Sequence, residues 1–439
     1  MESIYDIIKT ITPPDESARK AARRQWDSLA KPLGSLGVFE DMIAKLAALK
    51  GDTDVRIDDR RLLVFCADNG VVRQGVTQCE SDVTAKVAVA LAENRSSVSP
   101  MAQYANCRVI PADVGILDFP GHKDVLDRRV RNGTDDLSLG PAMTRDECLD
   151  AMLCGAKLAR ENAADGADIL LIGEMGIGNT TSSSAVICSL LGLDPAEVVG
   201  RGAGLSTSGL ARKREVIRRA LALNKPDPTD AVDVLTKVGG LDLAAMCGAY
   251  LGAAACNTPA VIDGFISAAA ALCATLLCPA AEKAFFPSHH SGERRGAALM
   301  DVFGLAAPLC AEMRLGEGGG AVMLLPLLDM ALLLYRSGQS FDRLGIEGMM
   351  GMLSDAERAK VVARLIREGY GGRILLSQDA IGYKKGSPTV RSGANADLIP
   401  NHHWGNIFNV FTPLLLEEGV SMAEIDRMLI DNPARLYGA

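Results

Sequence analysis

The chain has 439 residues, of which 48% are hydrophobic and only 4% aromatic, with 44 Gly and 16 Met. This composition excludes disordered and collagen-like proteins, and the scarcity of aromatic side chains excludes a surface that stacks nucleic-acid bases. The net charge of −8 excludes a general basic field for a polyanion, so we expect any bound phosphate to be held locally by backbone N–H groups and a few side chains.

Helices are expected over residues 1–50, where apolar residues recur at spacings of three and four on either side of a turn at 31–37. After residue 60 the pattern changes to short apolar runs that end in Gly, Asn or Asp, each followed by a helical stretch. These runs lie at 61–70, 108–115, 167–181 and 258–265. Short apolar strands that alternate with helices predict an α/β fold with a parallel sheet covered on both faces.

The pattern changes again near residues 338–350, where we expect a domain boundary. Beyond it we expect a charged amphipathic helix at 354–369, a strand at 371–379 and a pair of helices at 411–436. The most apolar long stretch, 241–277, is interrupted by charged residues and proline and is not expected to cross a membrane. The N-terminus shows no secretory signal.

The 11 cysteines are scattered singly, without a C-x-x-C pair. Several of them lie in apolar segments, as Cys66, Cys188, Cys247 and Cys273 do. This pattern favours a reduced, cytoplasmic protein in which cysteine is a small hydrophobic residue, over a catalytic or metal-binding thiol.

Four loops are rich in glycine or hydroxyl side chains, and the first of them directly follows an expected strand. The first, 173–184, opens a helix and lacks the Gly-Lys-Ser/Thr ending of a P-loop; the others are 200–209, 287–293 and 314–320. Glycine permits close backbone approach and a helix N-terminus favours an anion, so phosphate binding is favoured over a plain turn with capping hydroxyls. We expect the four loops to share one crevice at the carboxyl ends of the strands.

Two carboxylates of these loops are candidates for catalysis. Glu317 has glycine at 316, 318, 319 and 320, which presents it on bare backbone and suits a general base; a solvated turn glutamate is an equal alternative. Glu174 ends an expected strand, and paired carboxylates around a sugar can stabilise an oxocarbenium-like transition state, although a capping or salt-bridged acid is the alternative. His289 and His290 lack metal-site spacing, and we expect no metal there.

In this order the segments resemble the family of nicotinate-nucleotide:5,6-dimethylbenzimidazole phosphoribosyltransferases, which assemble the lower ligand of cobalamin. The resemblance covers about residues 1–335. It is carried by KPLGSLG at 31–37, FCADNGV at 65–71, DVG at 113–115, GPAM at 140–143, GEMGIGNTT at 173–181, VGRGAG at 199–204, KVGGLDLAAM at 237–246, VIDGF at 261–265, PSHHS at 287–291 and RLGEGGGA at 314–321.

This resemblance implies a doubly wound, Rossmann-like parallel sheet and a small helical domain that the N-terminal helices form with part of the C-terminal region. It divides the chain into the N-terminal part of the small domain at 1–60, a nucleotide-binding domain at 61–337 and an α/β appendage at 338–439. It also implies a homodimer whose active sites lie near the subunit interface.

The implied reaction converts nicotinate mononucleotide and an aromatic, benzimidazole-like base into an α-linked riboside 5′-phosphate and free nicotinate. It requires no metal or redox cofactor, no nucleic acid and no membrane. The resemblance assigns the general base to Glu317, places Glu174 near the ribose and Lys213 near the active site, and sets the phosphate against residues 176–181. The substrate-binding residues it implies are Gly176, Gly178, Asn179, Thr180, Thr181, Gly202, Gly204, Ser291, Asp263, Gly316 and Gly318.

Some positions depart from the family pattern. Asn69 stands where the family has His, and Gly319 where it has Ser or Thr. In the implied base pocket, which also includes Met175, Cys79 and Val87 occupy positions that resemble a Ser and a Gln. We therefore hypothesise an altered choice of base, such as another benzimidazole, a purine or a phenol. A catalytically silent paralogue that pairs with an active subunit is an alternative.

The last hundred residues resemble the C-terminal end of a phosphotriesterase-type amidohydrolase, in the segments 341–347, 368–380 and 411–438. Asp379 matches a metal-binding aspartate of that family, but the other metal ligands have no counterpart here. The segment is also far shorter than the roughly 250 residues that a barrel needs. A barrel fragment is therefore favoured over a metal-dependent hydrolase centred on this tail.

Overall fold

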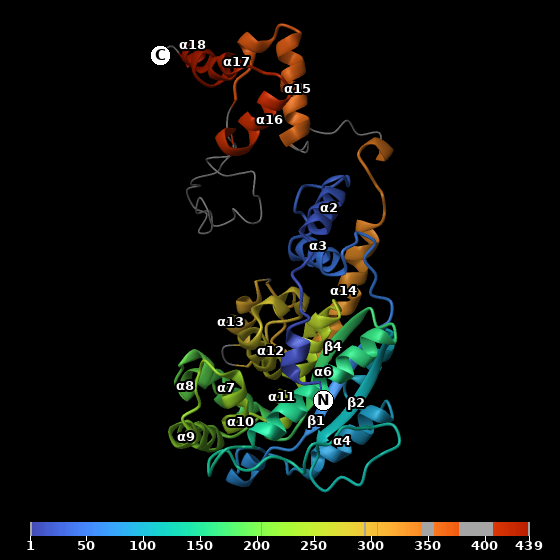
Figure 1. Ribbon diagram of the computed structural model, residues 1–439, viewed down its shortest axis with the longest axis vertical. Coiled ribbons are helices and arrows are strands. Elements are labelled where there is room, and N and C mark those ends of the chain that lie inside the picture. Colours follow the sequence, from blue (N-terminus) through green and yellow to red (C-terminus); the bar gives the residue numbers. More distant parts are fainter. Residues whose placement is uncertain are drawn as a thin grey trace. The chain divides into compact units, whose positions relative to one another are not determined.

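The protein was analysed as a computed structural model, which describes residues 2–202, 204–293, 296–304, 306–344, 355–376 and 407–437. The chain divides into two compact units (Figure 1). Unit 1 comprises Met1–Ala22 and Asp41–Leu333, and unit 2 comprises Arg23–Glu40 and Leu334–Ala439. Three helices begin in one unit and end in the other, namely α2 (Glu16–Asp27), α3 (Val38–Lys50) and α14 (Gly319–Tyr335).

Unit 1 is built on a parallel sheet in the order β3-β2-β1-β4-β5-β6. The strands are β1 (Arg60–Ala67), β2 (Cys107–Gly115), β3 (Leu126–Asp127), β4 (Ile169–Met175), β5 (Ala260–Ile262) and β6 (Phe285–Pro287). The chain winds outward from β1 to β3 and then, from β4, to the opposite edge, which confirms the doubly wound prediction. In such a sheet the crevice outside the carboxyl ends of the two strands at the reversal, here β1 and β4, is where ligands bind.

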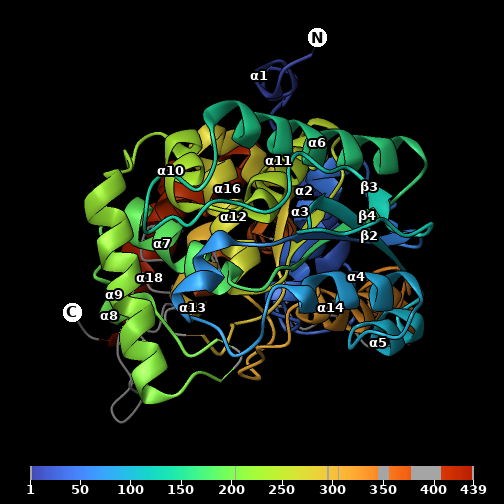
Figure 2. The same cartoon turned by 90° about the horizontal axis from the view of Figure 1, so that it is seen from below.

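Helices cover both faces of this sheet, with α6 and α11 on one face and α4 on the other (Figure 2). The helices of unit 1 are α1 (Ile4–Ile8), α4 (Asp82–Ala92), α5 (Ser99–Tyr104), α6 (Arg145–Ala164), α7 (Asn179–Leu191), α8 (Pro195–Val198), α9 (Thr207–Asn224), α10 (Ala231–Val238), α11 (Leu241–Ala255), α12 (Phe265–Leu277) and α13 (Gly296–Met300). Short 3-10 turns lie at η1 (Gly70–Gln74), η2 (Pro279–Ala284) and η3 (Asp301–Phe303). Because both faces are covered, the central strands β1 and β4 are almost entirely buried.

The helices α6 and α11 cross with their backbones in contact, and glycines on both helices make this possible. A Cβ atom on Gly155 would lie 1.8 Å from the Ala245 carbonyl oxygen, and one on Gly248 would lie 1.8 Å from the Met152 carbonyl oxygen. The obstacle is backbone on both sides, so no side-chain movement could relieve the overlap.

Gly248→Ala is therefore expected to destabilise unit 1 by about 3 kcal/mol or more, because α11 must move away from α6 and the sheet. Urea unfolding followed by circular dichroism measures the change. Gly140→Ala is the matched control, since a Cβ at Gly140 meets nothing within 4 Å. Equal stability of the two variants would contradict the close crossing.

The predicted helices at 1–50 and the strands β1, β2, β4 and β5 are confirmed. The short strands β3 and β6 were missed, because two or three residues are too few to produce a recognisable pattern. The cysteines of the described residues are free, and Cys66, Cys188, Cys247 and Cys273 are buried as expected. Within the described ranges no helix is both long and apolar enough to cross a membrane.

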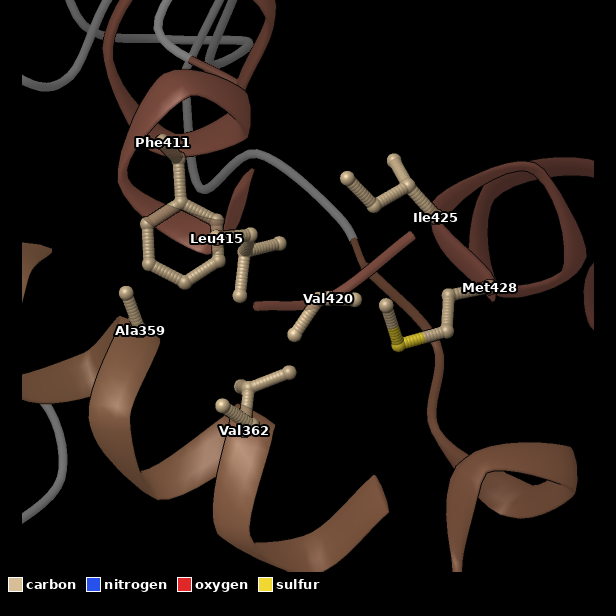
Figure 3. Close-up of a cluster of buried hydrophobic side chains, with 8 residues drawn as sticks. Ala359, Val362, Phe411, Leu415, Val420, Ile425 and Met428 are labelled. Carbon is tan, nitrogen blue, oxygen red and sulfur yellow. The ribbon is translucent and has the colours of Figure 1, made fainter. Parts of the chain in front are cut away.

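The C-terminal part of unit 2 has a hydrophobic core of its own, drawn in Figure 3. Its elements are η4 (Asp342–Leu344), α15 (Asp355–Arg367), η6 (Gly371–Arg373), η7 (Ile407–Phe411), α16 (Thr412–Glu417), α17 (Met422–Asp426), η8 (Arg427–Asp431) and α18 (Asn432–Tyr437). Ala359 and Val362 of α15 pack against Phe411, Leu415 and Met428. The predicted helix at 354–369 and the helix pair at 411–436 are thus confirmed.

The strand expected at 371–379 is wrong for its described part. Residues 371–373 form the 3-10 turn η6, and the carbonyl groups of Gly371 and Ile374 accept hydrogen bonds from Asn432 Nδ2 at 2.9 and 2.7 Å. A side chain of α18 thus takes the carbonyls that a neighbouring strand would need. Asp379 lies outside the described residues.

Candidate active site

A cavity of about 280 Å³ lies in unit 1 at the carboxyl ends of the central strands. All four glycine- and hydroxyl-rich loops contribute to its walls. Among the residues selected from the sequence, those that line it are Cys79, Glu174, Met175, Gly176, Gly178, Asn179, Thr180, Gly202, Gly204, Lys213, Asp263, Ser291, Gly316 and Glu317.

Glu174 is the penultimate residue of β4 and pairs in register with Phe65 of β1, which sets it at the carboxyl edge of the sheet. Its Oε2 accepts a hydrogen bond from Asn179 Nδ2, at the start of α7. The same amide nitrogen donates to Asp242 Oδ2 at 3.0 Å. One amide thus bridges two carboxylates, and this fixes the position of Glu174.

Burial raises the pKa of Glu174 to about 8, and the negative charges of Asp242, Asp263 and Glu317 add to the effect. Asn179 acts in the opposite direction through its hydrogen bond. The pKa values of Asp242 and Asp263 rise to about 6, again mainly through burial. The cavity is therefore lined by a group of acids, Glu174, Asp263 and Glu317, with the buried Asp242 next to them. This group attracts positive charge and holds a proton on Glu174 near neutral pH.

Glu317 lies in the loop before α14, with φ at +57°, a left-handed conformation unusual for a residue with a side chain. Its Oε2 accepts a hydrogen bond from the Val98 N–H at 3.0 Å. Two glycines allow the loop to approach β4 this closely. A Cβ on Gly173 would lie 2.9 Å from the Glu317 carbonyl oxygen, and one on Gly316 would lie 3.0 Å from Glu174 Oε1. Glu317 and Glu174 therefore face the same cavity from adjacent backbone.

Asp263 lines the cavity, but its carboxylate is used to hold the Glu317 loop. Its Oδ1 accepts a hydrogen bond from the Ala321 N–H at 2.9 Å. The N–H groups of Gly318 and Gly320 also donate to this carboxylate. A buried aspartate that accepts three N–H groups at the start of α14 fixes the backbone that presents Glu317.

Lys213 of α9 also lines the cavity. Its Nζ donates to Thr180 Oγ1 at 2.8 Å, and burial lowers its pKa to about 8. Gly202 lies against both groups, because a Cβ there would be 3.1 Å from Thr180 Oγ1 and 3.6 Å from Lys213 Nζ. A cationic side chain, a hydroxyl in the first turn of a helix and a glycine beside them suit a phosphate group.

Three selected residues do not line the cavity. Thr181 is enclosed within unit 1, and its Oγ1 has no hydrogen-bond partner among the described residues. Gly318 faces the sheet instead, since a Cβ there would lie 2.3 Å from Leu62 Cδ1. Val87 lies on α4 outside the lining, so of the expected base pocket only Cys79 and Met175 reach the cavity.

Several residues at the cavity were not selected from the sequence. Asp242 could have been found as the single charged residue of the apolar helix α11. Gln78 donates to the Gly204 carbonyl and connects two segments of the lining, and Phe265, Arg314 and Leu315 also line the cavity. Phe265, Arg314 and Leu315 lie in the segments VIDGF and RLGEGGGA that carry the resemblance, whereas nothing in the sequence pattern distinguishes Gln78 from a surface residue.

Asn69, the departure from the family's His, lies beneath the glycine loop. It is buried, and its Oδ1 accepts a hydrogen bond from Ser182 Oγ at 2.7 Å. Over the described ranges, no group of three or more His, Cys, Asp or Glu side chains could hold a metal ion.

Comparison with known proteins identifies the family. A family model described as Phosphoribosyltransferase matches residues 11–346. The nicotinate-nucleotide–dimethylbenzimidazole phosphoribosyltransferase of Acetivibrio thermocellus is 40% identical over 344 residues, which cover 78% of this chain and 98% of that protein. The chain belongs to this phosphoribosyltransferase family. The enzyme of the same name from Chloroflexus aggregans is 41% identical to this chain over 347 residues, which cover 79% of this chain and 98% of that protein.

A solved structure of the phosphoribosyltransferase family agrees. CobT from Thermus thermophilus matches with a TM-score of 0.72 at 37% identity, over 76% of this chain and 100% of that chain. The C-terminal residues 327–437 match a second model, described as Phosphotriesterase family. This match covers only the end of the chain, so it gives a likeness for the tail and not a family for the protein.

Proposed function

We propose that this chain transfers the phosphoribosyl group of nicotinate mononucleotide to 5,6-dimethylbenzimidazole or a related aromatic base. The products are α-ribazole 5′-phosphate, used for the lower ligand of cobalamin, and free nicotinate. The observation that carries the proposal is that Glu317 and Glu174 face the same cavity as the hydrogen-bonded pair of Lys213 and Thr180. Relatives of about 40% identity carry this enzyme name and span the same residues.

In the proposed mechanism, the bond between the ribose C1′ and the pyridinium nitrogen breaks, and its electron pair leaves with nicotinate as a neutral ring. The nitrogen of the incoming base forms the new bond to C1′. Glu317 takes the proton that this base loses, as a general base. The phosphate lies against residues 176–180 and Lys213.

Glu174 and the acids beside it stabilise the positive charge that develops on the ribose. In the empty site Glu174 holds a proton, because burial and three neighbouring carboxylates raise its pKa. The pyridinium cation of the bound nucleotide favours the charged carboxylate and drives that proton out.

Cys79 and Met175 lie on the base side of the cavity in this proposal, and Cys79 supports a choice of base that differs from that of the family. We further propose a cytoplasmic homodimer. The apolar residues Met323, Met330 and Leu333 are exposed on α14 and support such an interface. Residues 61–337 would form the nucleotide-binding domain, with 1–60 in the small domain and 338–439 as the appendage.

The test is to incubate the purified chain with nicotinate mononucleotide and each of a panel of bases, which includes benzimidazoles, adenine and p-cresol. Released nicotinate and the ribosylated base are measured by chromatography and mass spectrometry. Release that depends on an added base is the expected result. Absence of release with every base would contradict the proposed function, and efficient reaction with dimethylbenzimidazole alone would contradict the altered choice of base.

A further inference from the structure

His289 follows β6 and lines the cavity, and the mechanism above gives it no role. The position of the proton on the His289 ring depends on the adjacent residue, Ser288. Ser288 Oγ lies 2.7 Å from the Ile262 carbonyl oxygen, 2.8 Å from the Asp263 carbonyl oxygen and 3.0 Å from His289 Nδ1. A serine has one proton to donate, and the two carbonyl groups can only accept it.

Both carbonyl oxygens lie closer to Ser288 Oγ than His289 Nδ1 does, so we assign the Ser288 proton to a carbonyl group and the donor role to His289 Nδ1. Burial, with a smaller effect from His290, lowers the pKa of His289 to about 4, so its ring is neutral at neutral pH. The neutral ring with its proton on Nδ1 leaves Nε2 as a bare acceptor. Within the described part of the chain Nε2 has no hydrogen-bond partner.

Two glycines lie next to the ring. A Cβ on Gly320 would lie 2.1 Å from His289 Nδ1, so the start of α14 packs directly on the ring. A Cβ on Gly264 would lie 3.5 Å from His289 Nε2 and 3.9 Å from Ser291 Oγ. The two polar atoms thus flank one small space over Gly264, and all three residues line the cavity.

Ser291 supplies the complementary group at this space. Its Oγ accepts the Glu293 N–H at 3.3 Å, and its own O–H donates to no acceptor among the described residues. The space therefore offers one acceptor, His289 Nε2, and one donor, the Ser291 O–H. A hydroxyl group donates and accepts at once and satisfies both.

We propose that His289 Nε2 and Ser291 Oγ together bind one hydroxyl of the nucleotide ribose, in the space that Gly264 leaves open. This inference rests on the proposed function. Phosphate and the nicotinate carboxylate cannot donate to Nε2, and the proton of the base goes to Glu317, so the ribose hydroxyls are the donors that remain. Ser291 is thereby assigned to the ribose part of the substrate.

The test compares variants in titration calorimetry with nicotinate mononucleotide and its 2′-deoxy and 3′-deoxy analogues. In His289→Asn the amide can replace Nδ1 but nothing replaces Nε2, so we expect the Kd for the nucleotide to rise about 10- to 100-fold. His289→Gln, whose amide reaches the position of Nε2, should recover part of the affinity. His290→Asn is the matched control, because His290 does not line the cavity.

Gly264→Ala tests the space itself. Its φ of −120° suits alanine, and the nearest contacts of the new methyl group are 3.4 to 3.9 Å, so the melting temperature should not change. The methyl group fills the space, and we expect weaker binding of the nucleotide. For both His289→Asn and Gly264→Ala, the loss should largely vanish with the one deoxy analogue that lacks the bound hydroxyl.

If His289→Asn lost the same affinity for the nucleotide and for both deoxy analogues, the inference would be overturned. A purely structural role of His289 would weaken binding equally whether or not the ligand carries the hydroxyl. An equal loss in His290→Asn would overturn it too. If the unmodified chain binds the nucleotide and releases nicotinate while His289→Asn is unaffected, this inference alone fails. If the unmodified chain neither binds nor reacts, the proposed function fails and the inference with it.

Discussion

Glu317→Gln is expected to lower kcat for nicotinate release by at least about 100-fold, with little change in the KM for the nucleotide. A glutamine oxygen can still accept the hydrogen bond from the Val98 N–H, which is 3.0 Å from Oε2 in the native chain. The loop should therefore keep its conformation. What the amide cannot do is take the proton that the incoming base must lose. Steady-state kinetics with the best base of the panel measures the effect.

Glu312→Gln is the control for this variant. Glu312 lies in the same segment and also has a left-handed backbone, with φ at +51°, but it is exposed and does not line the cavity. Any effect of losing one negative charge on this segment should appear in both variants. A Glu317→Gln protein that stays within about threefold of the native rate would contradict the general-base role, since such a role supplies about 100-fold or more.

We expect the difference in free energy of unfolding between Glu174→Gln and the native chain to change with pH. As the pH rises from 5 to 8, the variant should gain stability relative to the native chain. The folded-state pKa of Glu174 is about 8, against the usual 4.5, mainly because the side chain is buried. At a pH between these two pKa values, Glu174 holds a proton in the folded chain and has lost it in the unfolded chain. The free energy of unfolding of the native chain therefore falls with rising pH, by up to about 1.4 kcal/mol per pH unit.

Glutamine is neutral at every pH and can still accept the hydrogen bond from Asn179, so it removes this dependence. Urea unfolding at several pH values gives the difference in stability between the two proteins. Glu161→Gln, at an exposed glutamate, is the control and should show no trend of this kind. A difference between Glu174→Gln and the native chain that is the same at pH 5 and pH 8 would contradict a proton held on Glu174.

Glu174→Gln should also lose activity, because the buried acids that lower the stability of the protein are the groups that stabilise positive charge on the substrate. Glu174, Asp242 and Asp263 are buried close together, and burial raises the pKa of each. Keeping these acids together costs stability in the empty site. A substrate with a pyridinium cation, and a transition state with positive charge on the ribose, attract these carboxylates. This attraction offsets the loss of stability.

The alternation of apolar runs and helices predicted the parallel sheet because buried strands between two helical layers need uninterrupted apolar residues. The loops that carry Glu174 and Glu317 could be selected because they combine clustered glycines with hydroxyl or carboxylate side chains, and Lys213 was selected through the family resemblance. Val87, Thr181 and Gly318 were placed at the ligand by motif alone. In the structure none of the three lines the cavity: Val87 lies on α4, Thr181 is enclosed within unit 1 on α7, and Gly318 packs against Leu62.

The sequence by itself determined the composition of this site: few aromatic residues, many glycines, and two glutamates on glycine-bearing loops. Only the tertiary structure decided how these groups act. Asn179 bridges Glu174 and Asp242, Asp263 holds the backbone of the Glu317 loop, and Ser288 Oγ lies 3.0 Å from His289 Nδ1. Each of these depends on segments far apart in the chain that meet where parallel strands end. Local patterns cannot encode such meetings, because hydrogen-bond direction and burial arise only when the strands and helices pack.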